Sequence, residues 1–187
     1  MAASTAPTVT AKCTPSTNAC WAPNVSARPA APCKSLAVWI APAMDDVAVK
    51  LHVQRPEAEW VKRSVGLSDS DLVLHDSGDV VTVGDLRITL MHTPGHTPGS
   101  QCFLVDGKLV AGDTLFLEGC GRTDLPGSDP DAMYESLTQR LAIVPDDTIL
   151  YPGHLYAPDP FATMGETRQR NYVFRINSLD QWRMFMG

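Results

Sequence analysis

The segment His92-Thr-Pro-Gly-His-Thr-Pro-Gly-Ser100 decides how the rest of the chain is interpreted, because it repeats a His-Thr-Pro-Gly unit. Each proline disfavours helical conformations at the residue before it. Each glycine can adopt positive φ without a steric penalty. Apolar runs at 86–91 and 102–105 flank the segment. We therefore predict a rigid loop between two core strands, which holds the imidazole of His96 in a fixed position.

The composition bounds the class of protein. The chain has 187 residues, of which 44% are hydrophobic, and this is enough for one domain with a sizeable core. Its net charge of −6 disfavours nucleic acid and anionic membrane surfaces as partners. No apolar run reaches the length of a membrane span. The five cysteines include no Cys-x-x-Cys pair, so we expect a cytoplasmic protein without a disulfide framework.

The N-terminal part differs from the remainder in composition. Residues 1–44 contain no Asp or Glu, so all 21 acidic residues lie from Asp45 onward. The same part is rich in Ala, Pro, Ser and Thr and shows no sustained helical or strand periodicity. We therefore expect 1–44 to be an atypical segment, disordered or non-native, that precedes a domain over 45–187.

From residue 45 onward the pattern predicts mixed secondary structure. A strand over 47–53 precedes a helix that begins near Pro56 and ends at Gly66. Two hairpins follow, with turns at 84–85 and 106–108. A long loop covers 115–127, and a helix over 130–143 is capped by Asp129. A strand over 148–151 and helices over 165–174 and 179–185 complete an α+β fold.

Three residues that could bind a metal come directly after predicted strands: His96, Asp113 and His154. Two imidazoles and a carboxylate suit zinc, or iron in a facial arrangement that leaves coordination positions open. A bound metal would lower the pKa of a bound water to about 7. The alternative is that all three are turn residues that bond to the backbone, and their spacing alone leaves both interpretations open.

Several motifs occur in the order typical of one family. They are Thr93-Pro-Gly-His-Thr-Pro-Gly-Ser100, Gly112-Asp-Thr-Leu-Phe116, Gly119-Cys-Gly-Arg-Thr-Asp124, Pro152-Gly-His154 and Thr163-Met-Gly-Glu-Thr-Arg-Gln-Arg-Asn171. Together they make roughly residues 48–187 resemble the metallo-β-lactamase superfamily, and most of all its glyoxalase II and persulfide dioxygenase branch. The resemblance implies an αββα sandwich with one or two zinc ions, or iron, at one edge. It also implies that His96 binds the first metal, Asp113 bridges both and His154 binds the second.

One motif of that family is absent. The family's His-x-His-x-Asp-His signature would be expected within or before residues 20–45, but histidines occur only at 52, 75, 92, 96 and 154. We therefore expect a fold incomplete in its N-terminal half, with at most one weakly held metal ion. Asp45 and Asp46 are candidates for replacement carboxylates.

Four further residues are candidates for the site. Cys120 lies in a glycine-rich loop, as a reactive thiol or as a small apolar residue. Arg122 and Asp124 resemble positions of an active-site loop in the family, or else form a local ion pair that holds the loop. His92 is interpreted as a residue that orients the ligands rather than as a ligand itself.

The resulting functional hypothesis is a metal-dependent hydrolase of the glyoxalase II type. In this hypothesis a metal-bound hydroxide attacks a hydroxyacyl thioester, so the partner is a small molecule, and the sequence leaves open whether the chain forms oligomers. The sequence leaves two alternatives to this hypothesis open. One is a mononuclear iron persulfide dioxygenase, and the other is an inactive remnant or binding module with the same fold.

Overall fold

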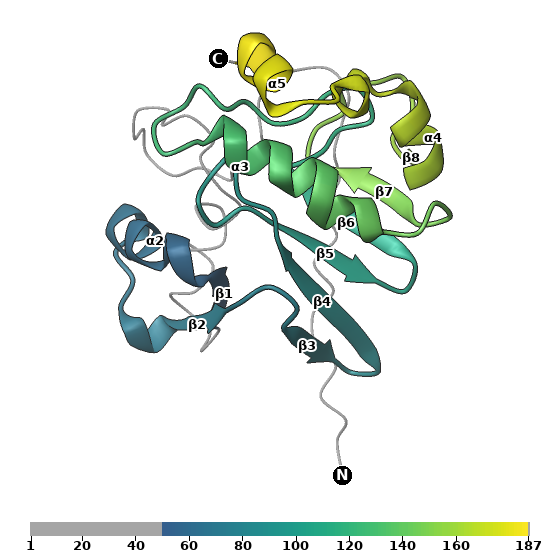
Figure 1. Cartoon of the computed structure of the whole chain (residues 1–187). Coiled ribbons are helices and arrows are strands. Elements are labelled where there is room, and N and C mark those ends of the chain that lie inside the picture. The colour runs from purple at the N-terminus through teal and green to yellow at the C-terminus, as the bar shows by residue number, and fades with distance from the viewer. Residues whose placement is uncertain (1–49, 187) are drawn as a thin grey trace. The chain divides into compact units, whose positions relative to one another are not determined.

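A computed structural model of the chain describes residues 50–186 (Figure 1). The predictions for 1–44, and those for Asp45 and Asp46, fall outside the described residues. Among residues 50–186, no helix combines the length and the apolar character that crossing a membrane requires.

The larger of two sheets has six strands in the order β3-β4-β5-β6-β7-β8. All neighbouring strands are antiparallel except β6 and β7, which run parallel. The strands are β3 (Val80–Val83), β4 (Leu86–His92), β5 (Gln101–Val105), β6 (Lys108–Gly112), β7 (Ile149–Pro152) and β8 (Ala162–Thr163). This arrangement confirms the two predicted hairpins and the α+β class.

The turn between β5 and β6 shows why the hairpin signal was strong. Val105 pairs with Lys108, so Asp106 and Gly107 form a two-residue turn. Both have positive φ, 47° for Asp106 and 66° for Gly107. A turn of that kind matches the right-handed twist of the strands that it joins, and Asp-Gly is one of the pairs that favour it.

A second sheet consists of β1 (Leu51–Gln54) and β2 (Leu72–His75), which run parallel. The sequence pattern predicted the first strand but not the second. Between them lie the 3-10 turn Arg55–Glu57 and helix α2 (Ala58–Val65). Gly66 ends this helix in the left-handed conformation, with φ of 74°, as predicted. Gln54 donates from Nε2 to Oε1 of Gln101 at 2.9 Å, which connects β1 to β5.

The remaining helices follow the predicted positions with one change. Asp129 caps α3 (Pro130–Glu135) by accepting a hydrogen bond from the backbone of Ala132. The predicted helix over 130–143 continues beyond α3 as a π-helical turn, Ser136–Arg140, and a 3-10 turn, Leu141–Ile143. The chain then forms α4 (Met164–Arg170), the 3-10 turn Tyr172–Arg175 and α5 (Leu179–Met186).

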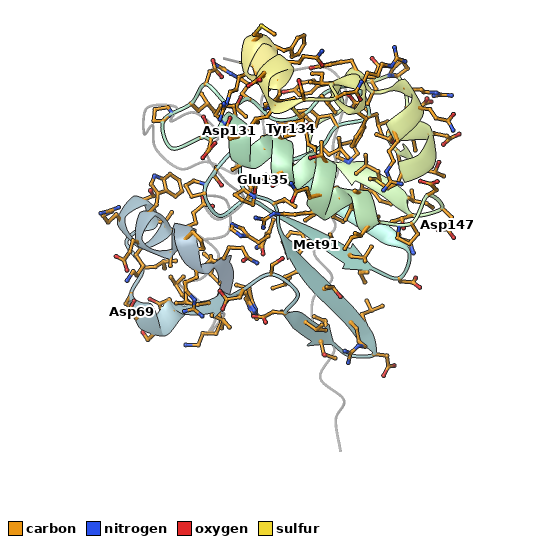
Figure 2. The ribbon with its side chains drawn as sticks, viewed as in Figure 1. Asp69, Met91, Asp131, Tyr134, Glu135 and Asp147 are labelled. Atoms are coloured by element: carbon orange, nitrogen blue, oxygen red, sulfur yellow. The ribbon has the colours of Figure 1, made fainter. Side chains whose placement is uncertain are left out.

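The main core lies between the six-stranded sheet and α3, which crosses its strands in Figure 1. Tyr134 on α3 contacts Trp182 on α5 with ring centroids 5.7 Å apart, and Asp131 pairs with Arg183 nearby (Figure 2). Buried residues that form this core are Cys102, Leu109, Ala111, Leu115, Leu117, Met133, Leu137, Leu141, Val144, Leu150, Met164, Val173 and Trp182. Because these side chains fix the central strands, the loops at the strand ends have a rigid base.

Candidate metal centre

The sheet topology brings the three predicted ligands to one edge. Strands β4 and β6 are both antiparallel to β5, and β6 is parallel to β7. The carboxyl ends of β4, β6 and β7 therefore point the same way. His96, Asp113 and His154 each follow one of these three ends.

Asp113 faces both histidines. Its Oδ2 lies 3.5 Å from Nε2 of His96, and its Oδ1 lies 3.3 Å from Nε2 of His154. The carboxylate is partly exposed, as is the imidazole of His154, whereas the ring of His96 is only 14% exposed. The structure thus places one carboxylate between two imidazole nitrogens.

The loop around His96 fixes the tautomer of its ring. Nδ1 of His96 lies 2.9 Å from the backbone carbonyl oxygen of Arg122. A carbonyl can only accept, so Nδ1 carries the proton and a neutral ring presents the lone pair of Nε2 to Asp113. A lone pair and a carboxylate oxygen repel each other unless a proton or a metal cation lies between them. The arrangement therefore suits a cation.

Hydrogen bonds and close backbone packing support the loop that contains His96. The backbone N–H of Thr93 donates to the carbonyl of Ser100 at 2.8 Å, and its hydroxyl lies 2.9 Å from that of Thr114. Gly95 has φ of 144°, and a β-carbon there would lie 2.5 Å from Cα of Met133. Only glycine allows the loop to approach α3 this closely.

Asp113 and His154 are held by a second close approach. Gly153 donates from its backbone to the carbonyl of Gly112 at 2.9 Å, which extends the contact between β6 and β7. A β-carbon on Gly153 would lie 2.7 Å from Oδ1 of Asp113. The ring of His154 stacks on Tyr156, with centroids 5.2 Å apart, and meets Phe116 edge-on at 6.0 Å. These contacts restrict both side chains.

Glu57 supports the same loop, a role that no sequence pattern indicated. Glu57 lies just before helix α2, and its side chain is buried against Gly99. Thr97 donates from Oγ1 to Oε2 of Glu57 at 2.8 Å, and the backbone of Gly99 donates to the same carboxylate. Burial raises the pKa of Glu57, and these hydrogen bonds oppose the rise in part. No local pattern in the sequence distinguished this residue from a solvated helix acid.

The other predicted residues have definite places. Arg122 forms a bidentate ion pair with Asp124, from Nε to Oδ1 at 2.8 Å and from Nη2 to Oδ2 at 2.7 Å. Both side chains are exposed, which fits a pair that shapes the loop. Burial raises the pKa of the Cys120 thiol to about 12, so it is protonated at neutral pH. Nε2 of His92 lies 2.8 Å from the carbonyl oxygen of Pro98, which directs that ring to the loop backbone.

Asn171 is a buried residue that organises the loop after Asp113. Its side-chain amide donates to the carbonyls of Phe116 and Gly119, at 3.0 and 2.9 Å, and its oxygen accepts from the backbone of Gly119 at 2.9 Å. It ends the last family-like motif of the sequence, and that was the only signal for it. The amide stabilises the turn that leads to Cys120.

The donor set fits a metal ion, although not as a complete cage. Two ligands of one tetrahedral zinc ion lie about 3.3 Å apart when each is about 2.0 Å from the metal. Both nitrogen-to-oxygen distances around Asp113, 3.5 and 3.3 Å, are of this size. As the side chains stand, residues 50–186 contain no group of three His, Cys, Asp or Glu in metal-binding geometry, so each histidine pairs with Asp113 separately.

The fold is that of a known family. The sequence profile of the metallo-beta-lactamase superfamily matches residues 29–154, and the chain belongs to that superfamily. Its structure superposes on ETHE1 from Myxococcus xanthus with a TM-score of 0.60 and 26% identity, over 82% of this chain and 77% of that one. The predicted family and fold class are thus confirmed, whereas the predicted boundary between 1–44 and 45–187 stays a prediction.

Relatives named for different activities are similar to parts of this chain. A probable polyketide biosynthesis zinc-dependent hydrolase, PksB of Bacillus subtilis, is 30% identical over 62% of this chain and 51% of its own length. The human mitochondrial persulfide dioxygenase ETHE1 is 33% identical over 71% of this chain and 52% of its own length. A hydroxyacylglutathione hydrolase of Aeromonas hydrophila is 46% identical over 43% and 31%, respectively. The chain therefore spans about half the length, or less, of these curated relatives.

Proposed function

We propose that Asp113, together with the histidines that face it, His96 on one carboxylate oxygen and His154 on the other, binds divalent metal, zinc in the first instance, and that the chain is a hydroxyacyl-thioester hydrolase of the glyoxalase II type. The observation that carries the proposal is the carboxylate of Asp113 between two imidazole nitrogens, with the tautomer of His96 fixed by the carbonyl of Arg122. Support also comes from the similarity to a hydroxyacylglutathione hydrolase and to a zinc-dependent hydrolase.

Each residue has a separate part in this proposal. Zinc, when bound, supplies a Lewis acid and lowers the pKa of a coordinated water to about 7. Asp113 would hold the cation through its carboxylate, and the loop keeps His96 in the tautomer that leaves Nε2 free to bind it. His154 is 42% exposed, so the substrate reaches the site from its side. The rings of Phe116 and Tyr156 limit the orientations that His154 can adopt.

The test measures bound metal and turnover of the full chain. The purified protein is analysed for zinc and iron, and hydrolysis of a hydroxyacylglutathione is followed before and after addition of Zn²⁺ or Fe²⁺. Near-stoichiometric zinc, with turnover that is lost in His96→Ala and kept in the control Asn177→Ala, at an exposed position away from the site, supports the proposal. A protein that binds no added metal and hydrolyses no thioester contradicts it, and favours the non-enzymatic alternative.

A second activity has one specific observation in its favour. Two histidines and one carboxylate are the ligands of mononuclear iron oxygenases, which leave the other coordination positions open. The longest match among the three relatives described above is to a persulfide dioxygenase. Oxygen consumption by the Fe²⁺-loaded chain with a persulfide substrate separates this activity from thioester hydrolysis.

A further inference from the structure

A second histidine cluster lies away from the candidate metal centre, on the sheet of β1 and β2. Nδ1 of His52, on β1, is 2.7 Å from Nε2 of His75, on β2. The two rings are nearly parallel, at 12°, with centroids 5.0 Å apart. His75 is buried, with 8% of its surface exposed, and His52 is exposed to solvent.

A carboxylate fixes the orientation of the buried ring. Nδ1 of His75 lies 3.1 Å from Oδ2 of Asp79, and the same oxygen accepts the backbone N–H of Asp76 at 3.1 Å. An ionised carboxylate only accepts, so Nδ1 of His75 carries the proton and Nε2 presents its lone pair to His52. Metal-binding histidines are commonly held in this way, with a carboxylate behind the ring.

We propose that Nδ1 of His52 and Nε2 of His75 bind a divalent transition-metal cation of the zinc class, at a site separate from His96, Asp113 and His154. Without the metal, the proton on Nδ1 of His52 bridges the two nitrogens. On binding, the exposed ring of His52 moves that proton to its own Nε2 through solvent. Both rings therefore stay neutral, and no net proton is released.

The surroundings allow this exchange. Two nitrogens that share one zinc ion lie about 3.3 Å apart, so the rings must separate from their present 2.7 Å. The exposed ring of His52 can make this movement, whereas Asp79 holds His75 in place. Among residues 50–186 no third His, Cys, Asp or Glu completes the set, so water fills the other positions and we expect weaker binding than at a three-ligand site.

The cluster is also connected to the loop of His96. Strand β1 leads directly into the 3-10 turn that contains Glu57, and Glu57 accepts a hydrogen bond from Thr97. A cation that ties β1 to β2 therefore stiffens the segment against which the loop packs. This connection does not depend on the activity proposed above.

The test follows imidazole nitrogens, because the chain has only five histidines and each ring can be assigned. Zn²⁺ is titrated into the full chain with ¹⁵N-labelled histidine rings. We expect Nδ1 of His52 and Nε2 of His75 to show the shifts of ligation, and Asp79→Asn to weaken that binding about 10-fold or more. The control His92→Gln leaves both shifts unchanged.

The same titration separates this site from the candidate metal centre. In His96→Ala/His154→Ala, the shifts of His52 and His75 persist, and His75→Gln abolishes those of His52. Should the double variant fail to fold, the individually assigned rings of the wild type give the same information. Rings of His52 and His75 that stay unchanged in excess Zn²⁺ would overturn the proposal, whatever His96 and His154 do.

Discussion

Replacing Gly153 with alanine tests how tightly the end of β7 packs against Asp113. The new β-carbon would lie 2.7 Å from Oδ1 of Asp113 and 2.8 Å from the carbonyl carbon and oxygen of Gly112, whereas real β-carbons essentially never approach other atoms closer than 3.0 Å. Two of these three neighbours are backbone atoms, so the strand end must shift. Overpacking of this kind costs about 1–3 kcal/mol of unfolding free energy. Because Oδ1 faces His154, we also expect metal affinity to fall about 10–100-fold.

The assay combines urea unfolding with Zn²⁺ affinity measured by competition with a chelator. Gly165→Ala is the matched control: it makes the same chemical change in the first turn of α4, where the nearest neighbours of the β-carbon would be Cβ of Asp146 at 3.1 Å and its carbonyl oxygen at 3.3 Å. Alanine favours a helix by about 1 kcal/mol over glycine, so we expect this variant to keep stability and affinity. Wild-type stability and affinity in Gly153→Ala would refute the reasoning from the close approach to Asp113.

Three further predictions concern buried groups. Burial raises the pKa of Glu57, so its ionisation opposes folding, and the free energy of unfolding falls as pH rises through that pKa. In urea unfolding, Glu57→Gln should therefore show a smaller decrease of stability with pH than the wild type and should be more stable than it at pH 7. Asn171→Ala leaves unpaired the backbone groups that the Asn171 side chain binds, and should lower the free energy of unfolding by about 2–4 kcal/mol in thermal unfolding. Asn177→Ala, at an exposed position, should lower it little. With its pKa raised to about 12, the thiol of Cys120 should react with iodoacetamide at pH 7 only after urea unfolds the chain, as mass spectrometry of its peptide can show.

The difference between the two proposed sites lies in what supports their ligands. Asp113 places one charged carboxylate oxygen beside each of two histidines, and the loops around it are held by close backbone packing at glycines. The His52 and His75 pair has its carboxylate behind one ring rather than between the rings. We therefore expect the centre at Asp113 to bind zinc more tightly.

Local sequence signals were sufficient for most elements. Pro56 and Gly66 mark the helix between β1 and β2, and Asp129 caps α3 through a hydrogen bond within its own turn. The Asp106-Gly107 turn was recognisable because few residue pairs tolerate two consecutive positive φ angles. Strand β2 was not recognised, since its four residues gain stability from pairing with β1 and carry little periodicity of their own.

The sequence by itself determined the family, the hairpins and the three candidate ligands, because motif order and turn chemistry are properties of short segments. Only the tertiary structure decided that these ligands meet, since the directions of β4, β6 and β7 depend on pairings between residues far apart in the chain. It also decided that Glu57 lies under the loop of His96 and that His52 meets His75. Such contacts arise from packing between separate segments, and no local pattern encodes them.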